Sequence, residues 1–205
     1  MSAEAPKLTP YERLKELPEI VVGEIIGGKL YVSPRPAIAH ARTASVLGGE
    51  LEGPFDRGRG GPGGWWIFDE PEVHLGKDVL VPDLAGWRRE NLPQLPDKAF
   101  FELSPDWVCE ILSPSTQRLD RTRKLPVYAR EQVLHVWLIS PDVQTLEVMR
   151  LDGDSYRIVG TYGAADTVRA EPFDAVELEL AAFWISPPEA DDLTRSANKE
   201  ERKGD

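Results

Sequence analysis

Apolar and polar positions alternate in several short runs of the chain, and this alternation predicts β-strands with one buried face. The first two runs, 21–26 and 29–33, flank Gly27-Gly28, a pair that is typical of a hairpin turn. Alternation predicts further strands at 65–68, 72–75, 81–87, 145–151 and 156–162, the last two forming a hairpin. The chain therefore begins and ends its ordered part with antiparallel β-structure.

Helical periodicity is limited to a few segments. Thr9 can cap a short helix and Glu12 can complete a capping box, and this helix should end before the next proline. Apolar residues at helical spacing predict a longer helix over 38–51. The segment 113–130 is helix-like, but Pro126 lacks a backbone N–H and its ring clashes with the carbonyl four residues earlier. We therefore expect this helix to kink or to begin late.

Two continuous apolar runs, 107–112 and 133–139, are typical of central strands that are buried on both faces. Strands flanked by helices predict an α/β or α+β fold, with helices on both faces of a mixed sheet. The glycine-rich stretch 57–64 should be a loop, and 90–105, interrupted by prolines, an ordered insertion or a lid. We expect one domain over residues 1–186 and a disordered polar tail over 187–205.

Composition narrows the class of protein. The 205 residues carry a formal net charge of −11, which argues against non-specific coating of nucleic acid. The single cysteine, Cys109, excludes a disulfide framework and a thiolate metal cage. With no long apolar run and no basic, apolar leader, we expect a cytoplasmic protein without a membrane partner.

Two carboxylates fall where a charge is costly. Glu110 lies within the buried run 107–112, and Asp83 follows Pro82 beside another apolar stretch. If the two strands are neighbours, a divalent cation such as Mg²⁺, which prefers hard oxygen ligands, would satisfy both acids. The alternative is structural: Asp83 would cap a turn, and Glu110 would form an ordinary buried ion pair.

A basic segment follows Glu110 and contrasts with the acidic chain. Asp120, Lys124 and Tyr128 are spaced by four residues, so they share one face of the predicted helix. A lysine can approach a phosphate as a point charge or stabilise an attacking water. Asp120 and Lys124 would otherwise form a surface pair worth about 0.3–0.5 kcal/mol. The basic residues of the segment are Arg118, Arg121, Arg123, Lys124 and Arg130.

These motifs resemble, in the same order along the chain, those of the Uma-two family of endonucleases. The resemblance covers about residues 24–151, and its most specific part is the stretch 110–116 followed by Asp120, Lys124 and Tyr128. It implies the restriction-endonuclease-like, or PD-(D/E)XK, nuclease fold. The remaining matching segments are Glu24–Leu30, Ser33-Pro34, His40, Pro82–Leu84, Trp107–Cys109 and Val136–Ile139.

The resemblance assigns roles to single residues. Asp83 matches the aspartate of the PD element and Glu110 the acid of the second strand, so both would be catalytic and would hold the metal. The lysine usual two positions later would fall at Leu112, which cannot serve, and the resemblance implies that Lys124 has taken its role. Glu24 would be a further metal ligand. Contacts to phosphate or water are expected from His40, Arg118, Arg121 and Tyr128.

The sequence thus predicts a nuclease that hydrolyses DNA with Mg²⁺ or Mn²⁺, and a homodimer is the expected assembly. One alternative is a non-catalytic binding or assembly module that retains the nuclease fold, which the acidic charge and Leu112 favour. Another is hydrolysis of RNA or of a smaller phosphodiester. Cys109 should face away from Glu110 by strand alternation, and His74 and His135 are expected to be structural.

Overall fold

The structure is a computed structural model that describes residues 8–185, and the tail predicted at 187–205 lies outside these residues. No helix in the described range is long and apolar enough to cross a membrane. The helices are α1 (Pro10–Lys15), α2 (Ile38–Leu51), η1 (Glu52–Asp56), α3 (Gln117–Leu119), η2 (Asp120–Lys124), α4 (Leu125–Arg130) and η3 (Leu180–Phe183). The strands are β1 (Val21–Ile26), β2 (Lys29–Pro34), β3 (Trp65–Asp69), β4 (Val73–Leu75), β5 (Asp78–Leu80), β6 (Leu84–Arg88), β7 (Trp107–Ile111), β8 (His135–Ser140), β9 (Thr145–Asp152), β10 (Ser155–Gly163), β11 (Thr167–Val168) and β12 (Leu178–Glu179).

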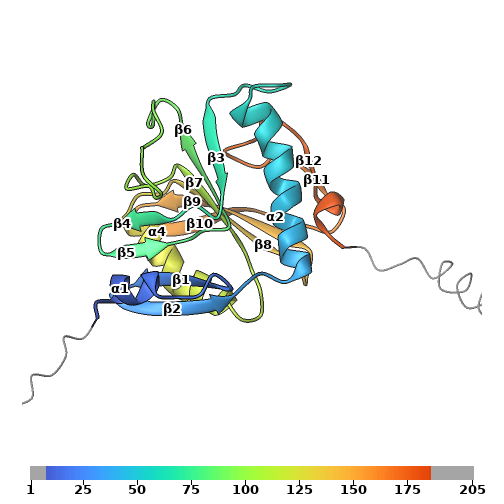
Figure 1. Ribbon diagram of the computed structural model, residues 1–205. Helices are drawn as coiled ribbons and strands as arrows, with labels where there is room; N and C mark the ends of the chain where they lie inside the picture. The colour runs from blue at the N-terminus through green and yellow to red at the C-terminus, as the bar shows by residue number, and fades with distance from the viewer. Residues whose placement is uncertain (1–7, 186–205) are drawn as a thin grey trace, which may run out of the picture.

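The strands form two main sheets. The larger has the order β10-β9-β8-β7-β6-β3, with β7 and β8 parallel and the other neighbouring strands antiparallel. The smaller has the order β2-β1-β5-β4, and β11 pairs with β12 in a separate ribbon. The molecule is therefore a mixed α+β protein, and the predicted fold class is confirmed (Figure 1).

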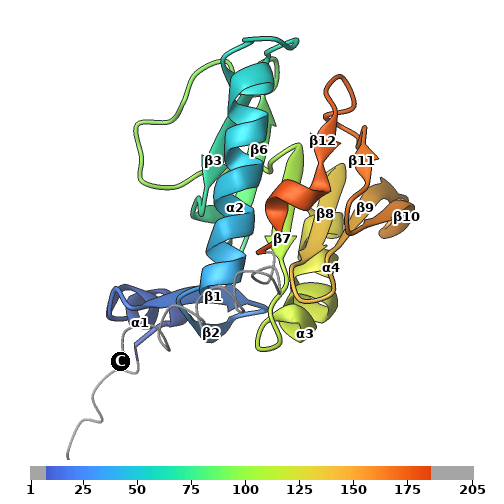
Figure 2. The same cartoon turned by 90° about the vertical axis from the view of Figure 1, so that its right-hand side faces the viewer.

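Helix α2 covers one face of the larger sheet (Figures 1 and 2). Its buried residues Leu47 and Leu51 belong to a core that contains Trp107 and Trp137 from the central strands. Phe173 packs against both indoles, with ring centroids 4.8 Å from Trp107 and 5.6 Å from Trp137. Rings packed edge to face at these distances stabilise the core beyond the area that they bury.

A second core fills the opposite face of the larger sheet. Val108 and Val136 of the central strands, Val127 and Tyr128 of α4, and Leu80 of β5 are all buried in it. The smaller sheet and helix α4 thus cover this face of the larger sheet together, whereas α2 covers the other face. The predicted helices on both faces are present, but a second sheet contributes to one of the two layers.

Strand alternation sorts the side chains of β7 between the two cores. Trp107, Cys109 and Ile111 belong to the core under α2, whereas Val108 faces the core beside α4. Glu110 therefore also points toward α4, away from Cys109, as the alternation predicted. A carboxylate is placed in this way at the end of a central strand, under the helix.

The prediction of a single strand over 81–87 is wrong, because the strand β6 begins only at Leu84. The chain leaves the smaller sheet after β5 and enters the larger sheet at β6, so that Val81–Asp83 crosses between the sheets. Pro82 has no N–H to give to a strand ladder, and the Val81 N–H donates instead to the Glu24 carboxylate at 2.9 Å. The crossing places Asp83 between the two sheets.

The helix predicted over 113–130 is interrupted as expected from its proline. Residues 117–130 are helical, but the stretch Asp120–Lys124 widens into a π-helical turn in which the Leu125 N–H bonds to the Asp120 carbonyl. Pro126 then occupies the first turn of α4 and supplies no N–H to the helical hydrogen bonds. The wider turn accommodates the proline without ending the helix.

The segment 90–105 is an ordered insertion. Phe101 stacks on Trp87 with ring centroids 4.1 Å apart and exchanges backbone hydrogen bonds with residues 72 and 74. The Trp87 indole donates to the Leu103 carbonyl at 3.0 Å. These contacts hold the insertion against the second core. No residue of the insertion lines the cavity where the two sheets meet.

Replacing a core residue of α2 should test this packing. We expect Leu47→Ala, at a side chain with 0% exposure, to lower the free energy of unfolding by about 2–5 kcal/mol through loss of buried area and formation of a cavity. Ile38→Ala, on the same helix at 81% exposure, should change it by less than about 0.5 kcal/mol. Urea denaturation measures both, and equal losses would contradict this arrangement.

Candidate active site

A cavity of about 290 Å³ opens where the two sheets, the N-terminus of α2 and the helical segment after β7 meet. Figure 2 shows the lower end of α2 above the β1–β2 hairpin, with α3 beside it. Polar and charged side chains that line the cavity come from segments far apart in sequence. They are Glu24, Ser33, Arg35, His40, Glu70, Asp83, Glu110, Ser113, Ser115, Thr116, Asp120 and Lys124.

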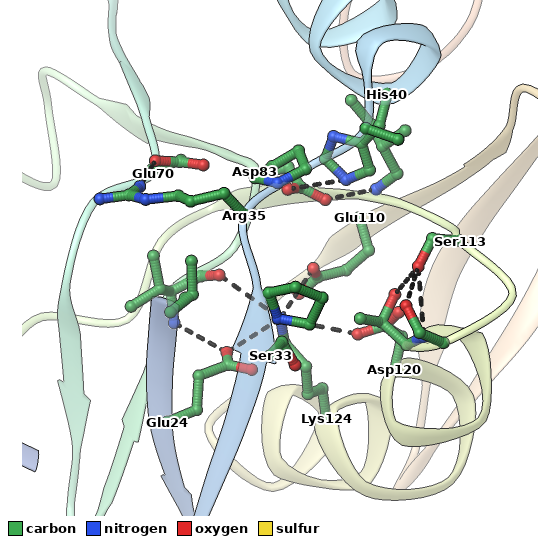
Figure 3. Close-up of a pocket in the computed structure, with 18 of the residues that line it drawn as sticks. Glu24, Ser33, Arg35, His40, Glu70, Asp83, Glu110, Ser113, Asp120 and Lys124 are labelled. Carbon is green, nitrogen blue, oxygen red and sulfur yellow. Dashed lines mark hydrogen bonds and ion pairs between the residues drawn. The ribbon is translucent and has the colours of Figure 1, made fainter. Parts of the chain in front are cut away.

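Lys124 lies at the centre of the charged side chains, as Figure 3 shows. Its Nζ is 2.8 Å from Glu110 Oε2, 3.0 Å from Glu24 Oε1 and 3.7 Å from Asp120 Oδ1. Each of these four residues is at most 6% exposed. An ammonium buried this deeply must be paired, because removing it from water costs several kcal/mol. We call these four residues the lysine cluster.

The same contacts fix the charge of the lysine. Burial lowers the pKa of Lys124, but the charges of Glu110 and Glu24 outweigh burial and raise it well above its ordinary value. Lys124 is therefore a permanent cation at neutral pH. It can donate hydrogen bonds and stabilise negative charge, and it cannot act as a general base.

Glu110 uses both carboxylate oxygens within the protein. Oε1 accepts from the Tyr128 hydroxyl at 2.5 Å and Oε2 accepts from Lys124. Burial raises the pKa of Glu110 well above its ordinary value, and Asp120, Asp83 and Glu24 raise it further, while Lys124 opposes them. The cavity therefore contains more carboxyl groups than one ammonium can neutralise.

Asp83 lies at the crossing between the sheets and is anchored at both oxygens. Oδ2 accepts from the Ile111 N–H at 2.6 Å, which ties Asp83 to the residue after Glu110. Oδ1 is 3.2 Å from His40 Nε2 in the first turn of α2. Burial lowers the pKa of His40, but the hydrogen bond and charge of Asp83 outweigh it, so the net shift is upward. His40 thus positions Asp83 at the cavity.

The donor set fits a hard divalent cation. Asp83 and Glu110 supply carboxylate oxygens to one cavity with excess negative charge, and Mg²⁺ commonly binds one or two carboxylates together with waters and substrate phosphates. Within residues 8–185, no group of three His, Cys, Asp or Glu side chains is arranged to hold a metal ion. Asp83 and Glu110 thus line one cavity beside a lysine, and Lys124 contacts both Glu110 and Glu24, at 2.8 and 3.0 Å.

Several residues predicted from the sequence lie together, and others lie elsewhere. The cavity brings together Glu24, His40, Asp83, Glu110 and Lys124. Arg118 and Arg121 lie outside it, and Arg121 pairs with Glu147 of β9 at 2.8 Å. Tyr128 is buried at 1% exposure and contacts Glu110, which gives it no access to a phosphate.

Two sets of contacts at the cavity were missed by reading the sequence. Arg35 and Glu70 pair at its rim, and a hydroxyl group of Ser113 contacts Ser115 and Thr116 at 2.9 and 3.0 Å. Arg35 lies between two prolines at the end of β2, and Glu70 directly follows the edge strand β3. The position of both depends on tertiary contacts that no local pattern encodes.

The fold and the cavity define a mixed α+β protein with a buried lysine–carboxylate site. The sequence model of the Uma2 family, described as "Putative restriction endonuclease", matches residues 9–182, and the chain belongs to this family. This confirms the resemblance that the motifs indicated.

A solved structure shares the fold. The chain is similar to the crystal structure of a protein from Anabaena variabilis ATCC 29413 described as a "putative nuclease belonging to DUF820", with a TM-score of 0.71 and 24% identity. The match covers 86% of this chain and 97% of that chain. No curated protein matches the chain.

The pKa of Asp120 provides a test of the lysine cluster. Burial raises this pKa from 3.8 to about 6, although Lys124 opposes the shift. The folded protein therefore holds a proton that the unfolded chain has lost, and the associated stability disappears as the pH rises from about 4 through about 6. Asp120→Asn, which mimics the neutral acid, should raise the free energy of unfolding near pH 7 by up to about 3 kcal/mol.

Near pH 4 the same substitution should have little effect, because Asp120 is then protonated in the folded protein. Urea denaturation across this pH range measures the difference. Asp152→Asn, at a side chain with 69% exposure, is the matched control and should leave the free energy of unfolding unchanged across this pH range. A gain for Asp120→Asn that does not depend on pH would rule out this assignment of the titration.

Proposed function

We propose that the protein is a nuclease that hydrolyses phosphodiester bonds of DNA, with Mg²⁺ or Mn²⁺ as cofactor. Membership of the Uma2 family supports a nuclease. The observation that carries the proposal is the contact of Lys124 Nζ with Glu110 at 2.8 Å in a cavity that Asp83 also lines. Two acids beside a permanent cation are the groups that metal-assisted phosphodiester hydrolysis requires.

Asp83 and Glu110 are the residues that would hold the ion, and Glu24 lies close enough to Lys124 to share the charge of the site. When bound, Mg²⁺ supplies a Lewis acid for the scissile phosphate and lowers the pKa of a bound water. His40 keeps Asp83 in place through the contact at 3.2 Å. Tyr128 restrains Glu110 from the opposite side.

Lys124 contributes a fixed positive charge. Its raised pKa keeps a proton on Nζ throughout the neutral range, so it can stabilise the charge that develops on the phosphorane. Leu112, where related nucleases place a lysine, is 4% exposed and packs in the second core. We therefore propose that Lys124, on the helical segment after β7, takes the role that a lysine on the strand has in related nucleases.

The charge of the molecule argues for weak and local binding to DNA. A net charge of −11 gives no broad basic surface, so phosphate contacts must be concentrated near the cavity. A homodimer would let two sites act on the two strands of a duplex. Strand β10, an edge of the larger sheet that exposes Ile158 at 52%, is the proposed contact surface.

A second candidate function is a non-catalytic binding or assembly module. It is favoured by the lysine cluster itself, since Glu110 is fully occupied by Tyr128 and Lys124 in the structure. Hydrolysis of RNA or of a smaller phosphodiester uses the same chemistry. A substrate panel of DNA, RNA and a small phosphodiester separates these activities.

Activity on plasmid DNA tests the proposed nuclease directly. Asp83→Asn and Lys124→Met should each reduce nicking in Mg²⁺ or Mn²⁺ by roughly 100-fold or more, because the first removes a charge that would hold the ion and the second removes the positive charge beside the reacting phosphate. Lys98→Met, at a side chain with 48% exposure, should retain full activity. Agarose gels resolve nicked from supercoiled plasmid. Equal nicking by every variant would identify a contaminating nuclease.

Metal binding separates the nuclease from the non-catalytic module. Isothermal titration calorimetry with Mn²⁺ should give heat for the natural protein and none for Glu110→Gln. Glutamine retains an acceptor for Tyr128, so the fold should persist, while the charge that binds the ion is lost. Glu102→Gln, at a side chain with 61% exposure, should bind as the natural protein does. Absence of heat in the natural protein would favour the module.

A further inference from the structure

Arg35 is the one basic side chain besides Lys124 and His40 among the described residues that line the cavity. Lys124 is committed to the lysine cluster, and His40 to Asp83. Arg35 differs from both because its side chain is 52% exposed at the rim. It is therefore the cation that an incoming phosphate can reach.

The contacts of Arg35 leave part of its guanidinium available. Nε donates to the Glu19 carbonyl at 3.0 Å and Nη1 donates to Glu70 Oε2 at 3.1 Å. Within residues 8–185, Nη2 makes no hydrogen bond or ion pair. Guanidinium groups bind phosphate through two parallel N–H donors, so Nη1 and Nη2 together provide a suitable fork once Glu70 is displaced.

Glu70 is held in an unusual position opposite Arg35. Its backbone has a φ of 45°, which is rare for a residue with a side chain, and its N–H donates to the Asp83 carbonyl at 3.0 Å. Strained backbone of this kind is concentrated at functional sites. Figure 3 shows the Arg35–Glu70 pair on one side of the cavity, across from Ser113 and Asp120.

The pair is weak enough to exchange. Both side chains are substantially exposed, at 52% and 39%, and exposed ion pairs contribute little to stability. The N-terminus of α2 lies beside the pair, and its N-cap residue, Ala37, has no side-chain capping group. The partial positive charge of a 14-residue helix therefore also favours an anion here.

A neighbouring cavity of about 530 Å³ along α2 does not compete for a phosphate. Its acidic lining residues are Glu52, Asp69, Glu70 and Asp83, and its described lining has no lysine or arginine, with His40 as the one basic side chain. A nucleic-acid backbone would be repelled there. The charge distribution thus restricts phosphate contact to the Arg35 side of the rim.

We propose that Arg35 binds a backbone phosphate of the substrate next to the scissile bond, and that Glu70 occupies Arg35 until the substrate replaces it. The inference rests on the proposed function, because it assumes a phosphodiester substrate in this cavity. It assigns substrate binding to Arg35 and a competing, inhibitory contact to Glu70.

The two substitutions should act in opposite directions. Arg35→Gln should weaken binding of a fluorescent DNA oligonucleotide about 10-fold and reduce the slope of log affinity against log salt by roughly one phosphate contact. Glu70→Gln should strengthen binding about 2- to 5-fold, since Arg35 is released. The double variant should bind as Arg35→Gln does, and Arg35→Lys should be intermediate because it keeps the charge but loses the fork.

Fluorescence anisotropy with Ca²⁺ in place of Mg²⁺ measures binding, and plasmid nicking is assayed in parallel. The matched controls are Lys98→Gln and Glu102→Gln, which break an exposed pair in the insertion 90–105 and should leave affinity unchanged. A purely structural ion pair would give Arg35→Gln and Glu70→Gln changes of the same sign.

The outcomes separate this inference from the proposed function. If the natural protein nicks plasmid but Arg35→Gln and Glu70→Gln do not change DNA affinity in opposite directions, the proposed role of Arg35 is wrong and the proposed nuclease activity stands. Opposite effects on binding without any nicking would support Arg35 and overturn the nuclease. Absence of both binding and nicking would overturn both.

Discussion

A buried ammonium group imposes the main constraint on this molecule. Lys124, at 3% exposure, must find carboxylate partners because its desolvation costs several kcal/mol. The partners come from three separate elements, with Glu24 on β1, Glu110 on β7 and Asp120 at the start of the π-helical turn. The smaller sheet, the larger sheet and the helix can satisfy these charges only when all three meet. The lysine cluster therefore fixes how the β1–β2 hairpin sits against β7.

The cluster contains more acid than structural pairing requires. One ammonium faces three carboxylates, and Asp83 adds a fourth to the same cavity. Burial and mutual repulsion raise the pKa values of Glu110 and Asp120, which means that the ionised site costs stability at neutral pH. A protein selected only for stability would replace such acids with apolar residues. Excess buried negative charge in a cavity is instead typical of a site that acts on a ligand.

The sequence predicted the parts of this arrangement that depend on local pattern. Alternation along β7 placed Glu110 opposite Cys109, and the spacing of Asp120, Lys124 and Tyr128 placed all three on one helix face. The break at 81–83 was missed, because apolar residues on both sides of Pro82 suit a single strand as well as two. The contact of residues 35 and 70 could not be predicted either, since it depends on how the two sheets pack.

In the proposed nuclease the lysine lies on a helix and not on a strand, and this changes what positions it. At residue 112, two positions after Glu110, a side chain is held by strand geometry alone, and here that place is filled by a leucine in the second core. Lys124 reaches the same carboxylate from a π-helical turn whose Leu125 N–H bonds to the Asp120 carbonyl. Pro126 favours this wider turn because it cannot supply the next α-helical bond. The proline that seemed to oppose a helical lysine therefore helps to place the ammonium at Glu110.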